Sequence, residues 1–384
     1  MRQSASVECG QKPRIVFIYL GRRGALGRFT LELAQAASSA EDVDIEFVIS
    51  SENEIVGQFV EQNVGFATLP TFKRATPATL VLGYRRVQQA LLNFLAEKRA
   101  TAVVTLMPHV WSPLLSRGIK RMGIRYVSVI HDVVPHPGDK TAWLTPWLLR
   151  DAKHADLVVT LSRSVAERLV GQKRISISQI LPLFHPDLRF GSSGKSRTLD
   201  PDRPFRILFF GRIMAYKGLS LLIDAVEMLR ASGHQIRLGI AGSGPLGAEL
   251  ERLRALDAEI MNRWISDDEV SGILARYDAI ACSHVEASQS GVVATAFGNC
   301  MPVVAMPVGG IAEQVVDGKT GVLARRVSAQ AFADAIRRLM ADGRIYASIS
   351  HHLRESAADR SMDRFLLEIA KEVELLTADR NARS

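Results

Sequence analysis

The stretch FRILFFGRIMAYKG at residues 205–218 decides the fold class, because it joins three structural signals in one short segment. Residues 205–211 are an apolar run of strand-forming residues that ends in glycine. Gly218 opens a helix-periodic stretch that continues to residue 231. Arg212 and Lys217 lie between the two. The segment therefore predicts a strand, a turn that carries two cations, and a helix.

The same alternation continues towards the C-terminus. Further apolar runs are IRLGIAG at 236–242, DAIACS at 278–283 and PVVAM at 302–306, and a helix is expected at 245–256. Strands that alternate with helices favour a parallel, doubly wound sheet.

The first half of the chain shows this pattern independently. RIVFIYL at 14–20 is followed by Gly21, Gly24 and Gly27 and then by an amphipathic stretch at 28–37. The remaining elements expected in this half are strands at 45–49, 102–106, 125–130 and 156–161 and a helix at 84–98. A second doubly wound sheet is therefore predicted.

A polar interval divides the two halves. Residues 191–204, GSSGKSRTLDPDRP, interrupt the pattern and are expected to form a linker. We expect an N-terminal acceptor domain at 1–190 and a C-terminal donor domain at 205–359. The closing segment 360–384 holds a periodic helix that is expected to cross back to the N-terminal domain. Two Rossmann-like domains would then face a central cleft that holds the substrates.

Composition restricts the class of protein. Of the 384 residues, 47% are hydrophobic and 23% are charged, which is typical of a globular protein. The N-terminus lacks the apolar run of an export signal, so a cytoplasmic location is expected. The long uncharged stretch 287–312 contains prolines and glycines and predicts strands and turns, not a membrane span.

The three cysteines do not indicate a disulfide framework, a metal site or a catalytic thiol. Cys9, Cys282 and Cys300 are too few and too widely spaced for a disulfide framework or a four-ligand zinc site. Cys300 as a nucleophile is an alternative that no accompanying histidine motif supports.

Charge is unevenly distributed. Residues 1–200 contain 26 Lys and Arg against 17 Asp and Glu, whereas residues 201–384 contain 22 against 23. A basic half suits an anionic membrane surface, which makes a peripheral location on the inner face of the membrane an expectation. Solvated helix faces would explain the same charges. No nucleic-acid-binding module is visible.

Arg212 and Lys217 are the first candidates for chemistry. Strand ends and helix N-termini of an α/β sheet collect phosphate groups, and two cations there would neutralise a diphosphate. Two surface cations beside a turn are the alternative explanation of this pair.

A second segment carries a resemblance. Residues 284–324, HVEASQSGVVATAFGNCMPVVAMPVGGIAEQVVDGKTGVLA, together with GRIMAYKG, resemble the retaining GT-B glycosyltransferases of family four. The resemblance runs from about residue 21 to about residue 340. It implies the two-domain GT-B fold and transfer of a sugar from a nucleotide-diphosphate sugar to a hydroxyl of a glycan or lipid-linked acceptor.

The resemblance also implies roles for individual residues. In catalysis, Arg212 and Lys217 would hold the donor diphosphate, Glu286 would contact the donor sugar, and His131, in the segment IHDVVPHPG, would lie beside the reacting sugar. Taken without the resemblance, His131 is more typical of a core histidine whose hydrogen bonds are satisfied. The residues implied in donor binding are Gly24, Gly27, Gly242, Gly244, Trp264, Ser290, Gly291 and Val292.

The sequence departs from the family at one position. The family commonly has a second glutamate that binds the ribose, but residues near Ala294 and Thr295 supply none, and the segment is a variant with E-A-S-Q-S-G-V. What contacts the ribose, and which nucleotide is bound, therefore stay open.

The resemblance implies a retaining, hexosyltransferase-type enzyme of polysaccharide biosynthesis that needs no metal and no cofactor besides its co-substrate. The aspartate pairs Asp42/Asp44 and Asp200/Asp202 have metal-binding spacing but lie outside the expected cleft. A non-catalytic nucleotide-sugar-binding or scaffold protein is the alternative. Two other enzyme classes fit the sequence less well. A non-hydrolysing nucleotide-sugar epimerase would need carboxylates in the cleft for proton abstraction, and a phosphorylase that uses pyridoxal phosphate would need a longer chain.

Overall fold

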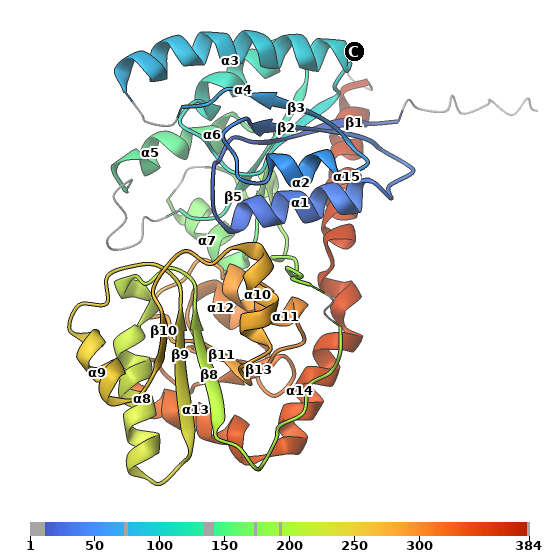
Figure 1. Ribbon diagram of the computed structural model, residues 1–384. Coiled ribbons are helices and arrows are strands. Elements are labelled where there is room, and N and C mark those ends of the chain that lie inside the picture. The colour runs from blue at the N-terminus through green and yellow to red at the C-terminus, as the bar shows by residue number, and fades with distance from the viewer. Residues whose placement is uncertain (1–11, 73–75, 134–141, 173–174, 192–193, 382–384) are drawn as a thin grey trace, which may run out of the picture. The chain divides into compact units, whose positions relative to one another are not determined.

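The computed structural model describes residues 12–72, 76–133, 142–172, 175–191 and 194–381. They form two parallel sheets with helices packed along them (Figure 1). The predicted pair of Rossmann-like, doubly wound sheets is therefore confirmed.

The first sheet has seven strands in the order β3-β2-β1-β4-β5-β6-β7. The inner strand β1, which lies between β2 and β4, is buried over Ile15, Val16 and Phe17, as a strand covered on both faces must be. The strands are β1 (Arg14–Tyr19), β2 (Asp44–Ser50), β3 (Gly65–Leu69), β4 (Ala102–Thr105), β5 (Arg125–Ile130), β6 (Leu157–Thr160) and β7 (Ile180–Pro182). The helices along this part of the chain are α1 (Ala25–Ala37), α2 (Val56–Val60), α3 (Pro77–Glu97), α4 (Ser112–Arg121), α5 (Thr145–Leu148), α6 (Arg150–His154) and α7 (Arg163–Gly171).

The second sheet has six strands in the order β10-β9-β8-β11-β12-β13. β8 lies at its centre and pairs in parallel with β9 and β11. The strands are β8 (Phe205–Phe210), β9 (Ile236–Ala241), β10 (Glu259–Met261), β11 (Ala279–Cys282), β12 (Val303–Ala305) and β13 (Gly321–Leu323). The helices are α8 (Leu219–Ala231), α9 (Glu249–Ala255), α10 (Asp267–Leu274), α11 (Gly291–Gly298), α12 (Gly309–Gln314), α13 (Ala329–Ala341), α14 (Gly343–Glu355) and α15 (Met362–Asn381).

The chain divides into two compact units. The first contains the described residues up to Val129, Arg150–Leu157 and the described residues from Leu366 onward. The second contains Ile130–Leu149 and Val158–Phe365. The two units do not show which substrate each part of the chain binds. The predicted acceptor and donor domains, their boundaries and the cleft between them therefore stay predictions. Among the described residues, no helix is both long and apolar enough to pass through a membrane.

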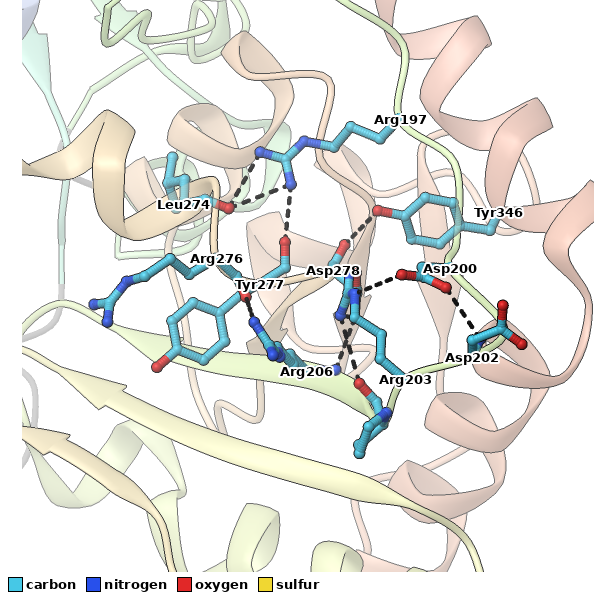
Figure 2. A network of polar contacts seen from close by, with 11 residues as sticks. Arg197, Asp200, Asp202, Arg203, Arg206, Leu274, Arg276, Tyr277, Asp278 and Tyr346 are labelled. Atoms are coloured by element: carbon cyan, nitrogen blue, oxygen red, sulfur yellow. Dashed lines mark hydrogen bonds and ion pairs between the residues drawn. The ribbon is translucent and has the colours of Figure 1, made fainter.

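The interval that was expected to be a linker is bound firmly to the second unit. The Arg197 guanidinium donates to the carbonyls of Leu274, Tyr277 and Asn299, with a distance of 2.9 Å to Tyr277, and its backbone amide donates to Ser350 Oγ at 2.7 Å. Figure 2 shows Arg197 spanning the carbonyls of Leu274 and Tyr277. This segment is therefore held in place by charge-assisted hydrogen bonds.

A buried carboxylate fixes the other end of the interval. Asp278 is 3% exposed and accepts from the Arg203 guanidinium and from the Arg206 amide. Tyr346 donates to the Asp278 carbonyl at 2.7 Å (Figure 2). The entry into the central strand β8 is thus set by ionic and backbone contacts together.

Replacing Arg197 by methionine should destabilise the second unit by about 2–4 kcal/mol, because carbonyls buried around the guanidinium would lose their donors. The measurement is urea unfolding followed by circular dichroism. Arg206→Met is the matched control, since the Arg206 side chain makes only one long hydrogen bond, 3.5 Å to the Arg276 carbonyl. Equal destabilisation by the two variants would contradict this account.

Candidate functional site

The turn after β8 is built by glycines. Gly211 and Gly218 have φ of 95° and 64°, values that favour glycine. A Cβ on Gly218 would lie 2.1 Å from the carbonyl oxygen of Ser283. Ser283 Oγ in turn donates to the Lys217 carbonyl at 2.9 Å. The turn after β8 therefore packs directly against the residues that follow β11. Both segments lie at the carboxyl ends of the adjacent strands β8 and β11.

Lys217 carries a buried charge. Its side chain is 7% exposed. Burial and, to a smaller extent, the nearby Arg212 guanidinium lower the pKa of its ammonium to about 8. No carboxylate among the described residues pairs with Lys217 or with the exposed Arg212. Because a buried cation without a counter-ion is costly, this arrangement favours an anionic ligand.

The N-terminus of α11 borders the same space. Ser290 caps the helix, and its Oγ accepts from the amide of Val293 at 3.3 Å. Within the described chain, the amides of Gly291 and Val292 have no acceptor. A Cβ on Gly211 would lie 3.1 Å from Lys217 Nζ and 3.4 Å from Val292 Cγ2. The Lys217 ammonium and the first turn of α11 therefore both lie close to Gly211, and a cation near a helix N-terminus is the composition of a phosphate site.

The loop after β9 lies directly against this turn. Gly242 and Gly244 have φ of 147° and 155°. A Cβ on Gly242 would lie 1.9 Å from the Gly211 carbonyl oxygen, and a Cβ on Gly244 would lie 2.2 Å from the Ile213 carbonyl oxygen. The Ile213 amide donates to the Ser243 carbonyl at 2.8 Å. The two predicted glycines are thus required by close backbone contact with the turn that carries Arg212.

Trp264 offers an aromatic surface near that loop. Its side chain is 49% exposed, and it follows Asn262, whose Oδ1 accepts from the Gly244 amide at 3.2 Å. The neighbouring Arg263 is held by Glu269. The indole is therefore available to a ligand, and its role against a nucleotide base stays a prediction.

The other predicted residues fall in three places. Glu286 is half-buried in the loop between β11 and α11. His131 is buried just after β5 and lies near His185, whose pKa is lowered to about 4 by burial and, to a smaller extent, by His131. Gly24 and Gly27 lie in the first unit at the start of α1, where the Gly24 amide donates to Glu54 Oε1 at 3.0 Å.

Some expectations lie outside the described residues or remain untested. The end of the segment IHDVVPHPG, from residue 134, and Cys9 are not described. The catalytic and donor-binding roles of all the residues above stay predictions. Within the described ranges no cluster of three or more His, Cys, Asp or Glu could hold a metal ion. The absence of such a cluster does not test whether the reaction needs a metal ion. The expectation that it needs none stays a prediction.

Both described cysteines are buried thiols. Burial raises the pKa of Cys282 to about 12 and also raises that of Cys300. A thiol that stays protonated is a poor nucleophile, so the structure argues against Cys300 in that role. Cys282 lies close to Lys217 and within hydrogen-bonding reach of Ser290.

Sequence comparison finds two known families within the chain. Residues 204–342 match the family described as Glycosyl transferases group 1, and residues 24–182 match the Glycosyl transferase 4-like domain. The two matches together span most of the chain.

Curated relatives are more distant. The chain is 28% identical over 254 residues to a GDP-mannose-dependent alpha-(1-6)-phosphatidylinositol monomannoside mannosyltransferase of Mycolicibacterium smegmatis, covering 62% of this chain and 66% of that protein. It is 30% identical over 167 residues to a D-inositol 3-phosphate glycosyltransferase of Corynebacterium urealyticum, covering 40% and 39%. The chain thus spans less than two thirds of the length of these relatives.

Solved structures share the fold over almost the whole chain. A glycosyltransferase from Rickettsia africae superposes with a TM-score of 0.71 at 16% identity, covering 95% of this chain and 99% of that one. The Anabaena protein HepE, in complex with UDP and glucose, superposes with a TM-score of 0.70 at 16% identity, covering 94% and 99%. At this identity the likeness establishes the fold.

Replacing Lys217 by methionine should stabilise the ligand-free protein by about 1–3 kcal/mol, because it removes a buried, unpaired charge. The folded pKa of about 8 lies below the usual 10.5, so this penalty on the wild type is fully present below pH 8 and disappears as the pH rises towards 10.5. Urea unfolding at pH 7 and pH 9.5 measures both effects.

The same variant should lose affinity for UDP and GDP in calorimetric titrations. Wild-type affinity should fall by about tenfold per pH unit above pH 8, because the ammonium that attracts the diphosphate deprotonates there. The residual affinity of Lys217→Met should not follow this pH dependence. A destabilised variant with normal affinity would show that Lys217 is a structural residue.

Proposed function

Because the chain belongs to the glycosyl transferases of group 1, we propose that it transfers a sugar from a nucleotide-diphosphate sugar to a hydroxyl group of a glycan or lipid-linked acceptor. One observation supports this more than any other. The ammonium of Lys217 is buried near the start of α11, and among the described residues it has no counter-ion and the first amides of that helix have no acceptor. A diphosphate leaving group supplies the missing negative charge.

The chemistry follows from that charge. When the bond between the anomeric carbon and the diphosphate breaks, negative charge develops on the departing oxygen, and preorganised cations and amides stabilise it. We assign this task to Lys217, Arg212 and the amides of Gly291 and Val292. These groups provide the stabilisation that a metal ion gives in other transferases, so we propose a metal-independent reaction without a cofactor.

The proposed reaction proceeds with retention. The acceptor oxygen forms its bond to the anomeric carbon on the face that the diphosphate leaves, and the acceptor proton passes to a phosphate oxygen of the leaving group. No protein nucleophile is then required. We assign Glu286 to the hydroxyls of the donor sugar and His131 to the neighbourhood of the reacting carbon. Trp264 would contact the base.

The relatives make such a donor chemically reasonable. The mycobacterial relative is by its name GDP-mannose-dependent, and HepE is described in complexes with UDP and UDP-glucose. We therefore take UDP- and GDP-sugars as the first donors to test.

Purified protein should release nucleoside diphosphate from at least one sugar in a panel that includes UDP-glucose and GDP-mannose. Arg212→Ala should lower this rate by about 100- to 1000-fold, because one group that stabilises the leaving charge is removed. Arg206→Ala, at the opposite end of the same strand β8, is the control and should retain the wild-type rate.

Coupled detection of the released nucleotide measures the rate, and the proton spectrum of a product anomeric centre tests retention. Ligand binding without any release, in the presence of acceptors, would favour the scaffold alternative. An inverted product would contradict the proposed stereochemistry.

We further propose that the first unit contacts an anionic membrane surface from the cytoplasmic side. On α3, Val81 and Leu82 are 63% and 72% exposed, and Arg85 and Arg86 are exposed on the following turn. Exposed apolar residues beside arginines are typical of a helix that binds at a lipid interface.

The protein should cosediment with vesicles that contain anionic phosphatidylglycerol, and it should do so much less with neutral phosphatidylcholine vesicles. Binding should weaken steeply between about 0.05 and 0.5 M salt because the attraction is electrostatic. The double variant Arg85→Ser and Arg86→Ser should bind less well. Salt-insensitive sedimentation would contradict the proposal.

A further inference from the structure

Helices α3 and α4 lie side by side in the first unit (Figure 1). A Cβ on Gly118 of α4 would lie 3.2 Å from Gln88 Nε2 and 3.5 Å from Leu92 Cδ1 of α3, so the two helices pack closely at this point. Together they carry the cationic residues Arg85, Arg86, Arg117, Lys120 and Arg121. Their one carboxylate, Glu97, is the last residue of α3 and lies about three turns beyond Arg86. The positive charge of this surface is therefore not balanced within the two helices.

Two of these cations have no partner. Arg117 and Arg121 are four residues apart and thus lie on one face of α4. Both side chains are exposed, and within the described chain neither makes a hydrogen bond or an ion pair. Lys120, by contrast, donates to Asp156 Oδ1 at 3.0 Å. Like charges at this helical spacing repel each other, so an anion bound between the two arginines would lower the electrostatic energy.

The helix dipole explains only part of this arrangement. A cation in the last turn of a helix is stabilised by the carbonyl end of the dipole, which accounts for Arg121 as the final residue of α4. Arg117 lies a full turn earlier, where this effect has largely disappeared. Its unpaired position therefore needs another explanation.

Neighbouring side chains show where the positive potential is concentrated. Burial raises the pKa of the Tyr84 phenol on α3, and the charges of Arg121 and Arg117 oppose this rise. Burial and, to a smaller extent, nearby cations that include Arg117 lower the pKa of His154 on α6. Tyr84 thus lies near both unpaired arginines. Its side chain is partly exposed, and among the described residues its hydroxyl has no hydrogen-bond partner.

Two guanidinium groups and a phenol match the chemistry of a phosphate group. Each arginine can donate a pair of N–H groups to phosphate oxygens, and the tyrosine hydroxyl can donate a further hydrogen bond. Arginine is favoured over lysine for this task because its planar donors fit two oxygens at once. The three side chains are therefore suited to one phosphate.

Exposed apolar residues on the same helix indicate where this phosphate comes from. Val81 is 63% exposed and precedes Tyr84 by three residues, so the two lie on the same side of α3. Leu82 beside it is 72% exposed. Apolar side chains next to cations are typical of a surface that binds at a lipid interface. A phospholipid offers its phosphate to the arginines and its acyl chains to Val81 and Leu82.

We propose that Tyr84, Arg117 and Arg121 form a binding site for the phosphate group of an anionic membrane phospholipid. This inference rests on the membrane contact that is proposed above for α3. It adds a discrete site that includes α4, at which the phosphate is recognised by hydrogen bonds as well as by charge.

The test measures cosedimentation of the full chain with phosphatidylcholine vesicles that contain phosphatidylglycerol. Arg117→Gln with Arg121→Gln should weaken binding by about 10- to 30-fold, since each cation near an anionic surface contributes about a factor of five. Arg325→Gln with Arg326→Gln is the matched control. It removes the same charge from two exposed residues of the second unit that have no ion pair within the described chain, and it should bind like the wild type.

Two further variants separate phosphate recognition from diffuse charge. Arg117→Lys with Arg121→Lys keeps both charges but loses the paired N–H donors, so it should bind about three- to tenfold less well than the wild type. Tyr84→Phe changes no charge and should weaken binding by about two- to fivefold, the loss expected for one hydrogen bond.

Two results would overturn the inference. If the lysine and phenylalanine variants bind like the wild type, α4 supplies only diffuse charge. If the wild type binds inorganic phosphate in calorimetry, the glutamine variant does not, and neither binds vesicles, the ligand is a soluble phosphate.

Failure of this inference is distinguishable from failure of the proposed function. A loss of vesicle binding in Arg85→Ser with Arg86→Ser, without any loss in the α4 variants, would leave the membrane contact of α3 in place and remove the site on α4. Release of nucleoside diphosphate in the absence of vesicles measures the proposed sugar transfer independently of both.

Discussion

The buried charge of Lys217, which no carboxylate among the described residues neutralises, is the feature on which the proposed site depends. Lys217 is buried to the point where its pKa falls to about 8, and the residues around it are a second cation, a neutral thiol and the positive end of α11. The cation and the helix N-terminus repel an ammonium, and a neutral thiol does not compensate its charge. An arrangement of this kind is stable only because the rest of the second unit fixes it, and it becomes favourable once an anion enters.

Close packing of backbones is what keeps that charge in position. The turns after β8 and β9 touch through Gly211, Gly242 and Gly244, and the turn that carries Lys217 rests on the residues after β11. Any side chain at these glycines would separate the loops by the width of a methyl group or more. A parallel sheet supplies the geometry, because the carboxyl ends of neighbouring strands lie at one edge.

The comparisons agree with this picture at the level of fold and family. Solved structures with only 16% identity superpose over nearly the whole chain, which shows how little of the sequence the GT-B architecture constrains. In this chain the loop before α11 is held in place by hydrogen bonds from Ser162 and Gln314 and by close contact with two glycines.

The sequence by itself determined the alternation of buried strands and helices and, through GRIMAYKG and the segment after His284, the resemblance to the glycosyltransferases. Continuous apolar runs such as RIVFIYL and FRILFF exist because central parallel strands are covered on both faces. It did not predict β3, β7, β10 and β13, which are the outermost strands of their sheets and are short and partly exposed, so they lack such a run.

Only the tertiary structure decided which residues meet. Nothing local in the sequence marks Ser162 or Gln314 as supports of the loop at 286–290, since they come from α7 and α12. The burial of Lys217 likewise depends on what packs around it. Desolvation and hydrogen bonding are set by neighbours in space, and a linear pattern records only neighbours along the chain.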